Sequence, residues 1–201
     1  MKLYSPAAER NTGPLLSLLQ RAFPARGLVL ELAAGTGQHA VAFAAGLPGL
    51  TWLPTDRDAA ALASVATRWE EAGLPNLRPP QRLDLMERPW AVEGVAAILA
   101  VNLLHISPIA VAAALFAEAG RLLPVGAPLV TYGPYRFEGV ALAPSNEAFD
   151  EDLRGRDPAW GLRAVGALEA MAAAAGIGLE SVEALPANNH GLVWRRHGGE
   201  G

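Results

Sequence analysis

Apolar and polar residues follow one another along this chain in two alternating patterns. Residues 28–34 form a short apolar run with one acid, bounded by Gly27 and Gly35, which is typical of a buried strand. Residues 38–46 suit a helix that ends at Gly46. Further strands are expected at 50–55, 77–83, 95–102 and 127–133, and further helices at 58–72, 108–122 and 162–176.

The end of the chain departs from this alternation. Residues 178–185 and 191–196 are expected to be strands, and the loop Pro-Ala-Asn-Asn-His between them is short enough for an antiparallel hairpin. Elsewhere the alternation of strands and helices implies a mostly parallel sheet covered on both faces. The sequence therefore predicts a doubly wound α/β fold, Rossmann-like and seven-stranded with an antiparallel last strand, in a single domain over residues 1–201.

Three other segments refine this prediction. Residues 1–12 form a polar N-terminal arm, and the first helix is expected to begin at Thr12–Pro14. Ser107 is the expected N-cap of the 108–122 helix, with Pro108 at its first position. Residues 134–160 are rich in Gly, Pro, Asn and Asp and have little apolar period, so they are interpreted as a functional loop or lid.

Composition and charge exclude several classes of function. The chain has 201 residues and a net charge of −4. It contains no cysteine, so disulfides and thiolate metal sites are excluded. The basic residues are scattered, which argues against a nucleic-acid partner. No apolar run reaches the ~18 residues of a membrane span, and the N-terminus lacks a signal-peptide core. We therefore expect a cytoplasmic protein without a membrane partner and, because the histidines share no ligand spacing, without a metal.

The strongest chemical signal is the glycine-rich turn Gly35-Thr-Gly37 between the first strand and the next helix. Such a turn brings bare N–H groups and the positive end of a helix dipole close to a ligand. With Ala40 it fits the relaxed dinucleotide pattern G-x-G-x-x-G/A, and Asp56 lies at a spacing suited to a ribose hydroxyl. A nicotinamide dinucleotide is therefore one candidate ligand.

Glu31 favours a different ligand. A carboxylate in a buried strand is costly unless it has a cationic or N–H-rich partner. The pyrophosphate of a dinucleotide would repel it, whereas the ammonium and sulfonium groups of S-adenosylmethionine would attract it. Asp56 and Asp84 follow the second and third strands, so all three acids are expected at one sheet edge. Asp56 would accept from the ribose hydroxyls and Asp84 from the adenine amine, with Leu85 against the ring.

The chain resembles a class I, seven-stranded S-adenosylmethionine-dependent methyltransferase, and more narrowly a little-characterised methyltransferase-like family. The stretches that carry this resemblance are SPAAERN from Ser5, ELAAGTGQH from Glu31, NLLHISP from Asn102, YGPY from Tyr132, SNEAFD from Ser145 and PANN from Pro186. They span nearly the whole chain. The resemblance implies the fold and S-adenosyl-L-methionine as cofactor. The expected cofactor-binding residues are Arg10, Asn11, Glu31, Ala33, Gly35, Thr36, Gly37, His39, Asp56, Arg57, Asp84, Leu85 and Asn102.

Transfer of a methyl group from a sulfonium requires an aligned nucleophile, and a base only where the nucleophile must lose a proton. In the fold that the resemblance implies, the end of the fourth strand points at the methyl group. Asn102 and His105 follow this strand, and with Tyr132 they are the catalytic candidates; a structural role for His105 is the alternative. The N/D-P-P-Y/F stretch of nucleobase methyltransferases is missing here. The candidate substrate-binding residues are Tyr135, Asn146, Trp160, Asn188 and Asn189, although Asn is also common in turns.

The sequence thus predicts a methyltransferase that acts on a small-molecule acceptor. A nicotinamide-dependent oxidoreductase and a non-catalytic cofactor-binding protein are the alternatives. A G-x-S-x-G elbow and a P-loop are both missing from the sequence, which argues against an α/β-hydrolase and a P-loop NTPase.

Overall fold

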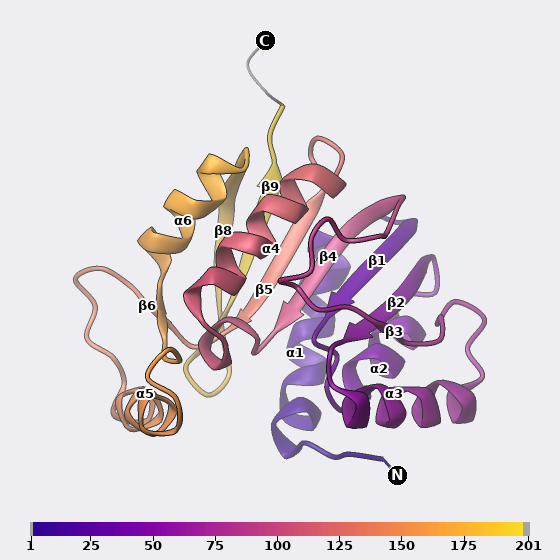
Figure 1. Ribbon diagram of the computed structural model, residues 1–201, viewed down its shortest axis with the longest axis horizontal. Coiled ribbons are helices and arrows are strands. Elements are labelled where there is room, and N and C mark those ends of the chain that lie inside the picture. The colour runs from indigo at the N-terminus through magenta and orange to yellow at the C-terminus, as the bar shows by residue number, and fades with distance from the viewer. Residues whose placement is uncertain (1, 199–201) are drawn as a thin grey trace.

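The computed structural model describes residues 2–198, and its helices and strands alternate through most of the chain (Figure 1). The helices are α1 (Pro6–Ala22), α2 (Gln38–Gly46), α3 (Ala59–Ala72), η1 (Leu104–Ile106, a 3₁₀ helix), α4 (Ile109–Leu122), α5 (Pro144–Arg156) and α6 (Val165–Ala174). The strands are β1 (Gly27–Leu32), β2 (Leu50–Asp56), β3 (Gln81–Arg82), β4 (Val95–Val101), β5 (Pro128–Gly133), β6 (Tyr135–Arg136), β7 (Arg163–Ala164), β8 (Ile177–Leu185) and β9 (Asn189–Arg196).

Seven strands form one sheet in the order β3-β2-β1-β4-β5-β9-β8, and β6 and β7 form a separate two-stranded ladder. β1 to β5 are parallel, while β9 runs antiparallel to both β5 and β8. The predicted fold class, including the antiparallel closing strand, is therefore confirmed. The strand order reverses between β1 and β4, and in open α/β sheets the ligand crevice lies outside the carboxyl ends of the strands at such a point.

Alternate side chains of each strand supply two cores, one on each face of the sheet. Leu30 of β1 packs with Leu115 of α4 and Leu168 of α6 on one face. Val29 packs with Leu15 of α1 and Phe43 of α2 on the other. This period of two explains why the strands are apolar runs, because both of their faces are covered (Figure 1). No helix within residues 2–198 has the length and apolarity to cross a membrane.

The first helix begins earlier than predicted. Most of the expected arm over 1–12 is helical, because α1 starts at Pro6 rather than at Thr12–Pro14. Ser5 is the N-cap, and its hydroxyl accepts a hydrogen bond from the Ala8 N–H at 3.2 Å. The Ser-Pro pair is the stronger start signal, and Pro14 is accommodated inside the helix.

The expected loop or lid over 134–160 is also corrected, because it contains α5 and β6. The helix has few apolar residues, but Pro144 occupies its first turn and Arg154 and Arg156 its last. Asp150, almost fully buried, accepts hydrogen bonds from Arg136, Arg154 and the Leu162 N–H. Polar contacts of this kind produce no periodic spacing of apolar residues, which is why the sequence pattern indicated a loop.

Three boundaries differ for local reasons. The third strand, expected over 77–83, is reduced to Gln81–Arg82 and one bridge from Leu77 to Trp52, because two prolines at 79–80 cannot donate to the ladder. The N-cap of α4 is Pro108 rather than Ser107, whose hydroxyl donates to the Leu103 carbonyl instead. The helix expected over 162–176 is shorter, since 163–164 pair with β6.

Candidate functional site

The glycine-rich turn connects β1 to α2 through a backbone of positive φ. Ala33, Gly35 and Gly37 have φ values of 52°, 55° and 78°. A Cβ on Gly37 would lie 3.0 Å from the Cα of Val65, so only glycine lets α3 pack this closely. A Cβ on Gly35 would meet nothing nearer than 3.9 Å. The space beside Gly35 is therefore open to a ligand, in front of the N-terminus of α2.

Glu31 is buried on the face of the sheet that α1 and α2 cover, with 2% of its surface exposed. Its carboxyl group accepts a hydrogen bond from the indole N–H of Trp52 at 2.6 Å. Burial raises the pKa of Glu31 to about 8, against the lowering effect of this hydrogen bond, and the charge of Asp56 raises it further. The partner that the sequence required for Glu31 is thus supplied within the protein, and a cationic ligand is not needed to account for its burial.

Asp56 ends β2 beside the turn. One of its oxygens accepts from the Gly35 N–H at 2.9 Å and the other from the Asp58 N–H at 2.9 Å. Each carboxylate oxygen has a second lone pair, so Asp56 can still accept from a ligand. The neighbouring Arg57 is exposed. Asp56 therefore fixes the turn and remains available to the hydroxyls of a bound nucleoside.

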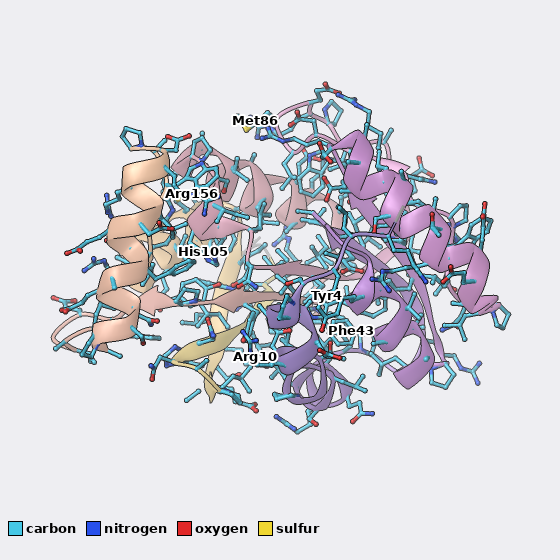
Figure 2. The ribbon with its side chains drawn as sticks, turned by 90° about the horizontal axis from the view of Figure 1, so that it is seen from below. Tyr4, Arg10, Phe43, Met86, His105 and Arg156 are labelled. Atoms are coloured by element: carbon cyan, nitrogen blue, oxygen red, sulfur yellow. The ribbon has the colours of Figure 1, made fainter. Side chains whose placement is uncertain are left out.

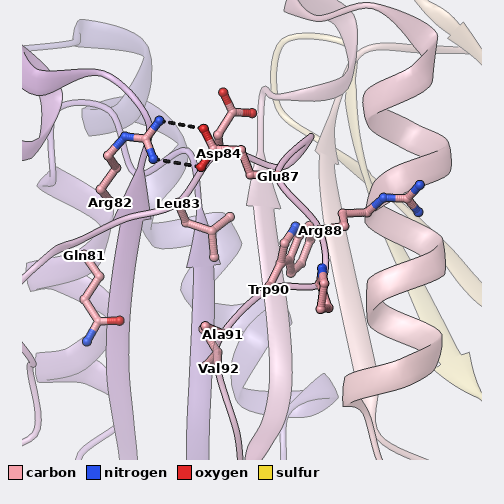
Figure 3. Close-up of a pocket in the computed structure, with 10 residues that line it drawn as sticks. Gln81, Arg82, Leu83, Asp84, Glu87, Arg88, Trp90, Ala91 and Val92 are labelled. Carbon is pink, nitrogen blue, oxygen red and sulfur yellow. Dashed lines mark hydrogen bonds and ion pairs between the residues drawn. The ribbon is translucent and has the colours of Figure 1, made fainter.

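Asp84 lies just beyond β3 and lines a recess of about 360 Å³ (Figure 3). Its carboxylate accepts from the Met86 N–H at 3.0 Å, and the next side chain, Leu85, is buried. Across the recess, Arg82 and Glu87 form an ion pair at 2.9 Å. The three acids that the sequence placed at successive strand ends thus lie at the ends of β1, β2 and β3, which are neighbours in the sheet.

The N-terminal segment is tied to the same turn. Arg68 donates to the carbonyls of both Thr36 and Leu3, at 2.9 and 2.7 Å. Gln38 accepts from the Ser5 N–H at 2.7 Å, so the chain that leads into α1 crosses the turn.

His39 binds the next turn of α1. Its Nε2 lies 2.7 Å from Asn11 Oδ1 and 3.2 Å from the Ala8 carbonyl, and its ring stacks on Phe43. Burial lowers the pKa of His39 to about 4. Of the expected cofactor-binding residues, Asn11 and His39 therefore bind each other in the α1–α2 interface.

A second cavity, of about 500 Å³, lies beyond the ends of β4 and β5. It is enclosed by the first turns of α1, the segment after β4, the end of β5, helix α5 and the β8–β9 loop. Its lining comprises Ala7, Arg10, Asn11, Asn102, His105, Tyr132, Pro134, Ser145, Asn146, Phe149, Pro186, Ala187, Asn188 and Asn189. Figure 2 looks onto this edge of the sheet, with Arg10 on α1 and His105 on η1. The structure thus gathers most of the predicted catalytic and substrate-binding residues in one cavity.

His105 is 5% exposed and lines this cavity. Burial, and then the charge of Arg163, lower the pKa of His105 to about 4; no hydrogen bond from the described residues contributes to this shift. The ring packs edge-on against Phe149, with centroids 5.6 Å apart. His105 is therefore a neutral imidazole at pH 7, and its lowered pKa makes it a weaker proton acceptor than an exposed histidine.

The two other catalytic candidates flank His105. Asn102 has a φ of 55°, which Asn tolerates better than most residues, and its N–H donates to the Tyr132 carbonyl at 2.8 Å. Burial raises the pKa of the Tyr132 phenol. The hydrogen bond from the Asn102 N–H to the Tyr132 carbonyl holds the ends of β4 and β5 together at the cavity.

The substrate-binding candidates divide into two groups. Asn146 donates to the Asn188 carbonyl at 3.0 Å, Asn188 donates to Ser145 at 3.1 Å, and Asn189 donates to carbonyls of its own loop. These bonds join α5 to the β8–β9 loop in the cavity wall. Tyr135 is buried in the core beside α4 and α6 and lines a neighbouring cavity, while Trp160 packs under the Arg156 guanidinium at 5.3 Å. Neither of these two lines the cavity around His105.

Among the residues around the site that were not predicted from the sequence, Phe149 and Arg163 contribute most to the position of His105. Phe149 lies three residues after Asn146 on α5, so both face the cavity, but this spacing has meaning only once the segment is known to be a helix. Arg163 donates to the Leu104 carbonyl at 2.8 Å and also to the Ser107 carbonyl. The Gly161 N–H donates to the His105 carbonyl at 3.0 Å. η1, and His105 with it, is therefore held in place from β7, a contact without a local sequence signal.

The sheet order, the antiparallel β9 and the positions of the glycine turn and the cavity define the class I, seven-stranded methyltransferase fold. Residues 2–196 match the family model described as "Protein of unknown function (DUF938)". The chain belongs to this family.

Solved methyltransferase structures share the fold at low sequence identity. The mitomycin 7-O-methyltransferase MmcR has a TM-score of 0.80 at 15% identity, over 94% of this chain and 54% of that chain. An O-methyltransferase family protein from Burkholderia thailandensis has a TM-score of 0.79 at 16% identity, over 96% and 58%. CalO1, a methyltransferase in calicheamicin biosynthesis in its SAH-bound form, has a TM-score of 0.72 at 20% identity, over 92% and 54%. The chain spans a little over half the length of these structures.

Proposed function

We propose that this protein is an S-adenosylmethionine-dependent methyltransferase that acts on a small-molecule acceptor. The observation that carries the proposal is the placement of two sites on a methyltransferase fold. The glycine turn and the acids of β1 to β3 lie on one side of the point where the strand order reverses, and the His105 cavity lies on the other. A nucleoside ligand and an acceptor would meet at the end of β4.

The residues around the turn fit the cofactor. Gly35 leaves open space before the N-terminus of α2, Asp56 offers acceptors to ribose hydroxyls, and Asp84 offers a polar group to adenine. Leu85, which the sequence placed against the adenine ring, is buried in the core and does not line the recess beside Asp84. Asn11 and Asn102, which the sequence assigned to the cofactor, line the acceptor cavity. When bound, S-adenosylmethionine supplies an electrophilic methyl group.

The acceptor side supplies alignment and a base. His105 is neutral, is held by contacts to its backbone and faces the cavity, so it is the group that would take the proton of an acceptor hydroxyl. Asn102 and Tyr132 present polar groups at the strand ends, where they would orient the acceptor. Most of the rate would come from the positioning of the acceptor, with His105 adding the proton transfer.

Isothermal titration calorimetry with S-adenosylhomocysteine and, separately, with NAD(H) tests the cofactor. We expect S-adenosylhomocysteine to bind and NAD(H) to give no heat. Binding of NAD(H) alone would instead identify an oxidoreductase.

Incubation with methyl-labelled cofactor and a metabolite extract tests catalysis. We expect a labelled small molecule, formed by the wild-type protein but not by a boiled control. Firm cofactor binding without any labelled product would indicate a cofactor-binding protein that is not an enzyme.

A further inference from the structure

The cavity around His105 carries an unbalanced charge. Of its lining side chains only Arg10 is formally charged at pH 7, and no carboxylate lines it. The remaining polar groups are mainly carboxamides, such as those of Asn102 and Asn189, which are neutral and both donate and accept. A cationic ligand would therefore find no counter-charge here, whereas an anionic ligand would find one.

Arg10 is one of the arginines that form no salt bridge within the described part of the chain, and it is the arginine that lines the cavity around His105. Within residues 2–198 the salt bridges of arginine involve Arg21, Arg82, Arg121, Arg136, Arg154, Arg156 and Arg195, and none involves Arg10. The acid next to it in sequence, Glu9, accepts a hydrogen bond from Tyr4 instead. Arg10 and Tyr132 line the same cavity, and the Arg10 charge opposes in small part the rise in the Tyr132 pKa that burial causes. An arginine without an ion pair at a cavity is suited to bind a carboxylate through its planar fork of donors.

Part of the cavity wall is apolar. Phe149 lies edge-on to the His105 ring, and Pro134 and Pro186 contribute two further surfaces. No hydrogen bond from the described residues contributes to the pKa of His105, so its imidazole ring is available to a hydroxyl group. The cavity therefore presents a cation, an apolar surface and a proton acceptor.

We propose that the acceptor is a small aromatic hydroxy acid, whose carboxylate pairs with Arg10 and whose hydroxyl group meets His105. This inference rests on the proposed function, because it names the substrate class of the same site. It assigns Arg10 to the acceptor rather than to the cofactor, among whose expected binding residues the sequence analysis placed it.

Three probe molecules that differ in charge test this proposal by calorimetry, on protein saturated with S-adenosylhomocysteine. The probes are 4-hydroxybenzoate, phenol and 4-hydroxybenzylamine, which are anionic, neutral and cationic at pH 7. We expect 4-hydroxybenzoate to bind at least ~10-fold more tightly than phenol, because an ionised hydrogen-bonded pair is gained. We expect 4-hydroxybenzylamine to bind more weakly than phenol.

The variant Arg10→Gln tests whether Arg10 causes the preference for the carboxylate probe. We expect it to reduce the affinity for 4-hydroxybenzoate to that for phenol, and to leave the affinities for phenol and for S-adenosylhomocysteine within about twofold. Arg21→Gln is the matched control, because Arg21 lies on the same helix but pairs with Glu183. It should leave the preference for the carboxylate unchanged.

Failure of this inference is distinct from failure of the proposed function. If S-adenosylhomocysteine does not bind, the proposed function fails, and the same three probes are then compared on the free protein. Equal binding of the probes, no binding of any, or a carboxylate preference that survives Arg10→Gln would each overturn the proposal. It would also be overturned if Arg10→Gln weakened S-adenosylhomocysteine alone, because Arg10 would then serve the cofactor.

Discussion

The two halves of the sheet edge differ in how their polar side chains are satisfied. In the half formed by β1 and β2 with α1 and α2, Glu31, Asp56 and His39 all have partners inside the protein. In the half beyond β4 and β5, the His105 ring and the Arg10 guanidinium face a cavity instead. The first half is thus preorganised and, under the proposed function, would support the cofactor, whereas the second leaves its groups free for an acceptor.

The two buried histidines show why burial alone does not identify a base. His39 and His105 are 7% and 5% exposed, and burial lowers the pKa of each to about 4. His39 is nonetheless occupied by Asn11 and Ala8, whereas His105 lines the cavity. A perturbed pKa indicates a functional site only together with access to a ligand.

Replacement of His105 should give the largest effect of any change considered for the site. We expect His105→Gln to lower the rate of label transfer from the cofactor by ~10²- to 10⁴-fold, the usual contribution of a general base. The affinity for S-adenosylhomocysteine should stay within about twofold, since His105 belongs to the acceptor half. Unchanged turnover would show that His105 has a structural role, as His39 does.

Replacement of His39 should act on stability instead. His39→Ala removes a stacked ring and leaves the buried Asn11 amide without its partner, so we expect unfolding to become easier by about 2–4 kcal/mol. Denaturant unfolding at constant m-value measures this loss. His105→Ala is the matched control and should cost less, because its ring has no such hydrogen bond.

The pH dependence of this loss has a definite sign. The pKa of His39 is about 4 in the folded protein, against 6.5 for an unperturbed histidine, so the unfolded chain binds more protons between these values. The stability that His39 provides is complete above pH 6.5 and declines as the pH falls towards 4. The difference between wild type and His39→Ala should therefore be largest near pH 7. A constant difference over this range would show that His39 titrates normally.

The sequence pattern was sufficient for the parts of the molecule that local rules determine. Strand ends in a parallel sheet lie at one edge, so the places of Glu31, Asp56 and Asp84 follow from the order of the strands. The partner of Glu31 could not be found in this way. In the register of β1 on β2, Val29 pairs with Trp52 and Glu31 with Pro54, so the indole is a diagonal neighbour of the carboxyl group.

The acceptor half was harder to predict, because its geometry depends on contacts between distant segments. Asn146 reaches the site through its bond to the Asn188 carbonyl, and Arg163 holds η1 from a two-residue strand. Tyr135 and Trp160 are polar aromatic residues on the same stretch of chain, yet they lie elsewhere. Residue type and loop position are therefore poor guides where a helix such as α5 decides which side chains face inward.

Asp56 tests whether the supporting half also binds the cofactor. We expect Asp56→Asn to weaken S-adenosylhomocysteine by ~10- to 100-fold, because a charged acceptor for the ribose is lost and an amide N–H is turned towards backbone donors. Asp58→Asn is the control, because the Asp58 side chain caps α3 instead of hydrogen-bonding the glycine turn. Unchanged affinity in a folded Asp56→Asn protein would limit Asp56 to holding the turn.

The smallest effect concerns Glu31, whose pKa of about 8 leaves it mostly protonated at pH 7. A cationic group of the cofactor close to the carboxyl group would favour the ionised form, so binding should release part of one proton. Titration of S-adenosylhomocysteine in phosphate and in Tris buffer at pH 7 measures this release from the difference in apparent enthalpy. We expect Glu31→Gln to abolish it, with its amide oxygen still able to accept from Trp52. Equal proton release by both proteins would mean that Glu31 belongs wholly to the internal support, with the indole as its partner in the bound protein as well.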